Sequence, residues 1–197
     1  RQLLAAVAQQ VIDQSRTQDF VFVHAVGSCP GSNLLERFLR RLHVNLRAYR
    51  RGRGERDISS QPPDSITDLK QQHHCFIRET GQLYPDSKFV IIVDAVNQFH
   101  ASLGAWDMWW LLRDEGVGNV RFLISTLTEE NNTYQNALIS CKHSRSLLVN
   151  VMSRDDLVDM VTATLLRYNK KLTNYDDKLL GNPVSYTHLT LPTIYSV

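Results

Sequence analysis

The sequence has few cysteines, no long apolar run and no excess of charge of one sign. Its three cysteines, Cys29, Cys75 and Cys141, follow no zinc-binding or redox spacing, so reduced thiols in a cytosolic compartment are the simplest interpretation. No apolar stretch approaches the ~20 residues that a membrane-spanning helix needs. The balance of 22 basic to 20 acidic residues is too close to neutral to indicate nucleic-acid binding by itself.

What the sequence does contain is a series of short apolar runs separated by segments of helical periodicity. Strands that alternate with amphipathic helices indicate βαβ units and a parallel sheet. A composition of 43% apolar and 21% charged residues in a chain of 197 fits one α/β domain with one sizeable core. The four predicted strands cover residues 20–26, 89–94, 121–127 and 146–152.

Two helices are predicted with particular clarity. Residues 34–42 place their leucines and Phe38 on one helix face. The last helix opens with Asp155 and Asp156, whose carboxylates complement the positive end of the helix dipole. Its expected inner stripe consists of Leu157, Val158, Val161, Leu165 and Leu166.

The run from Phe89 to Val93 is followed directly by Asp94. Five large apolar residues are typical of a central parallel strand with helices on both faces. The carboxylate of Asp94 would then emerge at the edge where open α/β sheets bind ligands. It is therefore the candidate for an acid that acts through water on the magnesium of a nucleotide. An ordinary aspartate at the end of a buried strand is the alternative.

No G-x-x-x-x-G-K-[ST] motif, the loop that cradles phosphates in P-loop NTPases, occurs in the chain. The segment 27–32 has two glycines and two serines after a strand, but no lysine follows it. We expect a strand-to-helix turn here, with Ser32 or Asn33 as the N-cap of the next helix.

In their order and spacing, several strings resemble STAND-class P-loop NTPases with NACHT-like modules, as in nephrocystin-3-like proteins and telomerase protein component 1. The matching strings lie within residues 22–42, 90–99 (Walker B strand), 120–127 (sensor strand) and 168–180. The resemblance implies a three-layer P-loop NTPase-like parallel sheet over residues 1–167, in a chain that begins after the P-loop strand. The start of a helical lid follows at 168–183. The uncharged residues 184–197 resemble a translated sequencing adapter, and we expect them to be a non-native tail.

The resemblance also implies a function. ATP and Mg²⁺ would be the cofactors of the full-length protein, with Asp94 holding the metal through water and Thr126 sensing the γ-phosphate. The module would act as a nucleotide-dependent assembly switch in the cytoplasm, with an association with cilia also suggested. It would bind protein partners through TPR or WD repeats that are missing from this chain. Without the phosphate-binding lysine, tight nucleotide binding by this chain alone is not expected.

Asn97 and Gln98 stand where strongly hydrolysing members of the family carry further acids. An amide cannot take a proton from water, so the complete protein would be a slow NTPase at most. These residues and the absent lysine also favour the main alternative, a catalytically inactive α/β domain that binds only proteins. A third possibility is a flavodoxin-like or toprim-like domain in which Asp94 serves another ligand.

Three clusters invite a functional interpretation that their context does not favour. The eight arginines of residues 37–56 have only Tyr49 interleaved, so we expect a solvated helix end and no nucleic-acid contact. The consecutive residues 73–75 (His-His-Cys) cannot all reach one zinc from a helix. The spacing of Trp106, Trp109 and Trp110 predicts the inner face of a helix between the second and third strands.

Overall fold

The computed structural model of the chain describes residues 2–112, 117–141, 144–149 and 153–170. The chain divides into two compact units, residues 1–145 and 146–197. The first unit is a mixed α/β structure, and the second contains helix α5 (Arg154–Leu166). The elements of the first unit are α1 (Gln2–Gln14), β1 (Phe20–Ala25), α2 (Leu35–Gly52), α3 (Ile66–Leu83), β2 (Phe89–Asp94), the 3₁₀ helices η1 (Val96–Gln98) and η2 (Ser102–Asp107), β3 (Val120–Ile124) and α4 (Thr133–Ser140).

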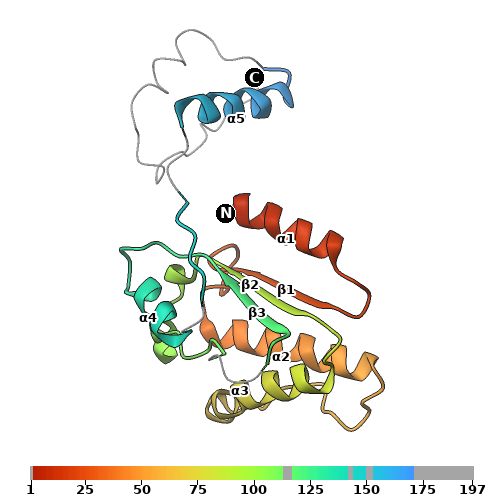
Figure 1. The fold of residues 1–197 in the computed structure, drawn as a ribbon. Helices are drawn as coiled ribbons and strands as arrows, with labels where there is room; N and C mark the ends of the chain where they lie inside the picture. Colours follow the sequence, from red (N-terminus) through yellow and green to blue (C-terminus); the bar gives the residue numbers. More distant parts are fainter. Residues whose placement is uncertain (1, 113–116, 142–143, 150–152, 171–197) are drawn as a thin grey trace. The chain divides into compact units, whose positions relative to one another are not determined.

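The three strands form one parallel sheet in the order β1-β2-β3. Residues 89–94 therefore occupy the central strand, as the apolar run predicted. Phe89 pairs with Phe20 on one side and with Val120 on the other, and Asp94 pairs with Ala25. Because all three strands run the same way, their carboxyl ends meet at one edge of the sheet (Figure 1).

Helices α2 and α3 cover one face of the sheet, and α1 lies on the other side (Figure 1). Phe22 and His24 of β1 pack on Phe38 of α2, with ring centroids 6.1 and 5.1 Å apart. On the covering face of α2, four of the five predicted positions are buried, whereas Leu34 precedes the helix as its N-cap and is 36% exposed. Burying each large side chain of this kind contributes about 1.5 to 3 kcal/mol. The fully buried apolar residues on this face of α2 are Leu35, Phe38, Leu39, Leu42 and Leu46.

The fourth predicted strand does not form over residues 146–149, and 150–152 lie outside the described residues. Leu147 and Leu148 are 87% and 72% exposed. An apolar run becomes a strand only where a neighbour pairs with its backbone, and the described part of the second unit contains no strand. Helix α5 begins as predicted, with Ser153 Oγ accepting a hydrogen bond from the Asp156 amide.

The tryptophan segment differs from its prediction as well. The expected helix is replaced by η2 and turns, because Leu103 and Met108 adopt left-handed φ values of 62° and 54°. All three indole N–H groups instead donate to main-chain oxygens within the segment, at 2.8 to 3.0 Å. Trp110 is fully buried in the core, whereas Trp106 and Trp109 are half-buried.

The basic stretch is only partly solvated, which corrects the expectation of an exposed helix end. Arg47 and Arg50 are 8% and 6% exposed, and their guanidinium groups lie 4.6 and 5.1 Å from the Phe76 ring. Both nitrogens of the Arg50 fork donate to Glu55 at 2.6 Å. Stacking on an aromatic ring and a bidentate ion pair allow arginine to be buried where isolated charge would be costly.

Most of the predicted helical lid, residues 171–183, and the predicted tail, 184–197, lie outside the described residues. The boundary at residue 168 stays a prediction. None of the helices in the described ranges has both the length and the apolar character needed to cross a bilayer.

Candidate functional site

Asp94 ends β2 at the carboxyl edge of the sheet, as predicted. Its side chain is only 8% exposed, and its Oδ1 accepts a hydrogen bond of 2.5 Å from Ser125 Oγ. The Ser125 hydroxyl therefore donates its one proton to Asp94. Its lone pairs accept from the Ala95 amide at 2.8 Å. Ser125 thus fixes the carboxylate and the start of the following turn together.

The backbone around this contact is strained in one place. Ala95 has a φ of 58°, in the left-handed region, at a cost of about 1 to 3 kcal/mol for a residue with a Cβ. Ser125 compensates through its main chain, since its N–H donates to the Val93 carbonyl at 3.1 Å and its carbonyl accepts from Val96 at 2.9 Å. The chain after β2 is therefore held against the chain after β3.

A second carboxylate reaches this edge from a part of the chain that was not predicted to supply one. Glu130 Oε2 accepts a hydrogen bond of 2.7 Å from Asn97 Nδ2, and Asn97 is 6% exposed. Asn131 Nδ2 donates to the Asn97 carbonyl at 3.1 Å. A carboxylate from the β3–α4 loop thus lies beside the amide side chain of Asn97. The two residues are 33 positions apart, and the sequence gives no signal for this contact.

Thr126 follows Ser125 at the same edge, and its hydroxyl is engaged. Its Oγ1 shares a hydrogen bond of 2.5 Å with Oγ1 of Thr133, which is fully buried at the start of α4. The Thr133 hydroxyl also lies 3.2 Å from the carbonyl oxygen of Glu130. The two predicted site residues, Asp94 and Thr126, therefore lie at the same edge in two separate hydrogen-bonded groups, which adjoin where Ser125 precedes Thr126 in the chain.

The turn after β1 reaches the same edge, but it is not a phosphate loop. The N-cap of α2 is Leu34, which makes no side-chain cap, so the prediction of Ser32 or Asn33 is wrong. Ser32 Oγ instead bonds back to Cys29, donating to its carbonyl at 2.7 Å and accepting from its amide at 3.2 Å. Short hydroxyl side chains often choose such local partners over the helix that follows.

His24 of β1 holds this turn in place through both of its ring nitrogens. Its Nδ1 accepts from Arg41 Nη1 at 2.9 Å, so its Nε2–H must donate to the Ser32 carbonyl at 2.8 Å. Burial lowers the pKa of His24, and the charge of Arg41 acts in the same direction, although the Ser32 carbonyl opposes both. The neutral ring thus ties strand, turn and helix together.

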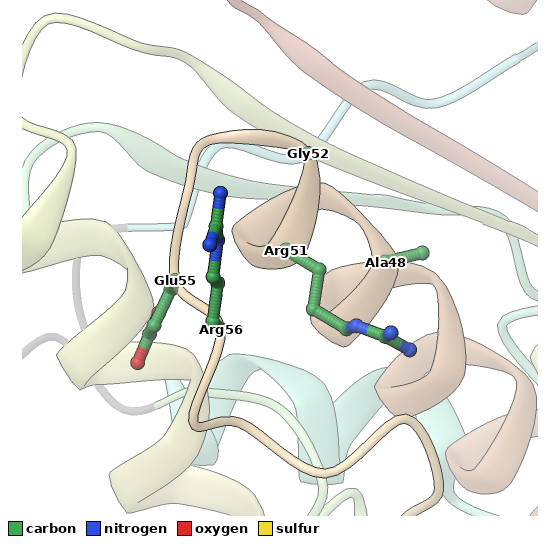
Figure 2. A pocket seen from close by; sticks show the side chains of 5 residues that line it. All are labelled: Ala48, Arg51, Gly52, Glu55 and Arg56. Atoms are coloured by element: carbon green, nitrogen blue, oxygen red, sulfur yellow. The ribbon is translucent and has the colours of Figure 1, made fainter.

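Of two surface hollows formed by the described residues, the larger one lies at the wrong edge for a ligand of Asp94. It has a volume of about 620 Å³ and is lined by the end of α2 and the loop after it, including Arg51, Glu55 and Arg56 (Figure 2). Tyr49, one turn earlier, bonds to Gln18, which precedes β1. The larger hollow therefore lies near the amino edge of the sheet. The smaller hollow, about 470 Å³, is lined by the start of α2 together with Ser102 and Leu103.

The polar edge offers carboxylate and hydroxyl oxygens from Asp94, Ser125 and Thr126. In the described part of the chain, no three His, Cys, Asp or Glu side chains are grouped to hold a metal. Among the same residues, Asp94 Oδ2 has no hydrogen-bond partner, so it can accept a metal-bound water. Carboxylate and hydroxyl oxygens are the ligands that Mg²⁺ and its waters prefer.

Residues 73–75 (His-His-Cys) lie on α3, as expected.

Comparisons with models of protein families, with curated proteins and with solved structures gave no match to this chain. Function is therefore inferred from the residues at the sheet edge.

Proposed function

We propose that the chain is part of the nucleotide-binding module of a STAND-type signalling or scaffold NTPase, with a P-loop NTPase-like fold. The observation that carries this proposal is the place of Asp94. It ends the central strand of a parallel sheet and is hydrogen-bonded to Ser125, which directly follows the neighbouring strand. Open parallel sheets bind ligands at this edge, and a Walker B acid occupies this position.

In this proposal, each residue of the edge has a distinct task. Ser125 holds Oδ1 of Asp94, which would leave Oδ2 for a water on the metal. A bound Mg²⁺ would supply charge neutralisation for the phosphates. Thr126, whose hydroxyl bonds to Thr133 at the start of α4, would bond to the terminal phosphate instead, so nucleotide binding would alter the start of α4. That exchange is the proposed link between nucleotide and assembly state.

Turnover by this edge would be slow. Asn97 cannot act as a base, and the carboxylate of Glu130 already accepts a hydrogen bond from it. A switch that changes state on nucleotide binding fits this chemistry better than a fast ATPase. Protein partners bound through TPR or WD repeats, and a cytoplasmic, cilium-associated location, belong to the same proposal.

One observation favours the second candidate, a catalytically inactive α/β domain that binds only proteins. Asp94 is mostly buried and already has a protein partner, Ser125, that stabilises the Ala95 turn. A carboxylate with this purely structural task would give no magnesium dependence to any ligand.

Calorimetric titration of ATP into this chain, with and without Mg²⁺, distinguishes the two candidates. We expect weak, millimolar binding that requires Mg²⁺ and is lost in Asp94→Asn. Asp86→Asn is the matched control, because Asp86 is an exposed aspartate at the amino edge and should leave binding unchanged. Equal affinities with and without Mg²⁺ in both the wild type and Asp94→Asn would support the protein-binding domain.

A further inference from the structure

Two fully buried histidines join the helices that cover the sheet. His43 of α2 and His73 of α3 stack with ring centroids 5.2 Å apart, and His43 Nε2 lies 3.0 Å from His73 Nδ1. His73 Nε2 lies 2.9 Å from the main-chain oxygen of Trp110. The pair therefore connects α2, α3 and the segment that follows β2 (Figure 1).

The direction of this hydrogen-bond chain is determined by its end. The Trp110 carbonyl can only accept, so His73 Nε2 must carry the proton and His73 Nδ1 must be the acceptor. His43 Nε2–H then donates to His73. His43 Nδ1 is left unprotonated, and it has no hydrogen-bond partner within the described ranges. Burial lowers the pKa of both rings, so both are neutral near pH 7. In the neutral pair, both rings are Nε2–H tautomers.

The groups around the pair are unfavourable for a proton. From α2, Arg47 acts on His43; from α3, the pair faces His74 and, across Trp109, Lys70. Arg50, next to Arg47, is neutralised by Glu55. In the described part of the chain, no carboxylate bonds to either imidazole. Phe76 stacks on His43 with a centroid distance of 4.9 Å.

Burial is the largest cause that lowers the pKa of both rings. It acts together with the His73 ring and Arg47 to lower the pKa of His43 to about 3. For His73, burial and His74 outweigh the opposing Trp110 carbonyl, and the pKa is about 4. The unfolded chain, with histidine pKa values of about 6.5, binds more protons than the folded chain below that pH. The stability contributed by the neutral pair is therefore complete above about pH 6.5 and is lost progressively as the pH falls towards about 4.

We propose that His43 and His73 form an acid-sensitive latch that holds α2 against α3. A proton on Nδ1 of His73 removes the acceptor of the hydrogen bond from His43. A proton on His43 adds a buried N–H without an acceptor and a cation beside Arg47. The hydrogen bond from His73 to the Trp110 carbonyl is kept in either case, so acid loosens α2 from α3. This holds whether or not the carboxyl edge binds nucleotide.

The first test is the double variant His43→Gln/His73→Gln, compared with the wild type by urea unfolding between pH 7 and pH 5. Each of the two histidines should raise the unfolding constant of the wild type up to about tenfold per unit of falling pH. The double variant should lose this part of the rise and keep only the part due to His24, whose pKa is also lowered by burial. His100→Gln, which removes an exposed histidine, should retain the wild-type pH dependence. The same pH dependence in the wild type and the double variant would overturn the proposal.

Two measurements on the wild-type chain do not require the variant to fold. Long-range ¹H–¹⁵N spectra at pH 7 should show both rings as neutral Nε2–H tautomers, and an imidazolium or an Nδ1–H tautomer in either ring would contradict the latch. Hydrogen exchange at pH 5, corrected for its intrinsic pH dependence, should be faster in α2 and α3 around His43 and His73 than at pH 7. Unchanged protection of these two helices would also contradict it.

Discussion

At the scale of single residues, the carboxyl edge is organised by uncharged side chains. Ser125 determines the position of the Asp94 carboxylate, and Asn97 determines that of Glu130. A hydrogen bond to a charged group contributes about 1.5 to 3 kcal/mol, and a buried partner left without one costs a comparable amount. The hydroxyl and amide groups are therefore as important to this edge as its two acids.

Ser125→Ala should destabilise the chain by about 1 to 3 kcal/mol, because it leaves the mostly buried Asp94 and the strained Ala95 without their shared partner. Urea unfolding at pH 7 measures this loss. Ser125→Thr keeps the hydroxyl and is the control, with a smaller loss expected. A Ser125→Ala protein as stable as the wild type would show that the contact contributes little.

Asn97→Asp should not restore a catalytic base, although it replaces an amide with a carboxylate after the central strand. It places a second acid about 2.7 Å from Glu130 Oε2, where the wild type has an N–H donor. We expect a loss of about 1 to 3 kcal/mol, as for a buried polar group that loses its partner. Adding Glu130→Gln should recover much of it, because the glutamine amide can donate to the new carboxylate. Equal losses in the single and double variants would show that the two positions do not interact.

At the scale of elements, α3 approaches β3 closely at Gly81. A Cβ built there would clash with Val117 and lie 2.9 Å from Val120 Cγ2. Asn119 Nδ2 lies 3.0 Å from the Gly81 carbonyl and holds the contact in place. The smallest residue is therefore required by packing, since its φ is not in the left-handed region.

Gly81→Ala should destabilise the chain by about 1 to 3 kcal/mol through overpacking, despite the better helix propensity of alanine. Gly52→Ala is the matched control at the end of α2. A Cβ there meets nothing within 4 Å, so a neutral or slightly stabilising effect is expected. Thermal or urea unfolding of both variants checks the pair. A stabilised Gly81→Ala protein would mean that the neighbouring valines can move aside.

Periodicity predicted the elements whose structure depends on local pattern. The apolar run at 89–94 gave the central strand, and the leucine stripe gave the inner face of α2. The prediction of a helix from the tryptophan spacing was wrong because the left-handed backbone at Leu103 and Met108 interrupts an α-helix. Leucine and methionine are not residue types that indicate a left-handed backbone. The prediction of a fourth strand was wrong over residues 146–149. A strand forms only where a neighbouring strand pairs with its backbone, and the local sequence does not show whether such a neighbour exists.

The site was predicted in part for the same reason. The position of Asp94 follows from the strand that it ends, so sequence pattern sufficed. Glu130 was missed because its contact with Asn97 depends on the course of the β3–α4 loop. Arg47 and Arg50 were assigned to solvent because their charge was counted without Phe76 and Glu55, which accommodate it.

At the scale of the whole molecule, the proposed ligand-binding edge has no phosphate-binding loop beside it in the sequence. The chain lacks the G-x-x-x-x-G-K-[ST] loop, whose amides and lysine hold the phosphates, and in the proposal Asp94 only positions a metal. The chain should therefore show no measurable ATP hydrolysis in a phosphate-release assay with Mg²⁺. Release above the buffer rate that disappears in Asp94→Asn would contradict this expectation and indicate a complete site.

Paramagnetic mapping with Mn²⁺ and ATP tests the central claim most directly, because Mn²⁺ accepts the same oxygen ligands as Mg²⁺ and broadens nearby NMR signals. The proposed site predicts broadening centred on residues 94–97, 125–127 and 130 that is much reduced in Asp94→Asn. Broadening centred on the hollow around Arg51 and Arg56, or broadening of the carboxyl edge that is unchanged in Asp94→Asn, would contradict the assignment of Asp94 to a metal–nucleotide site.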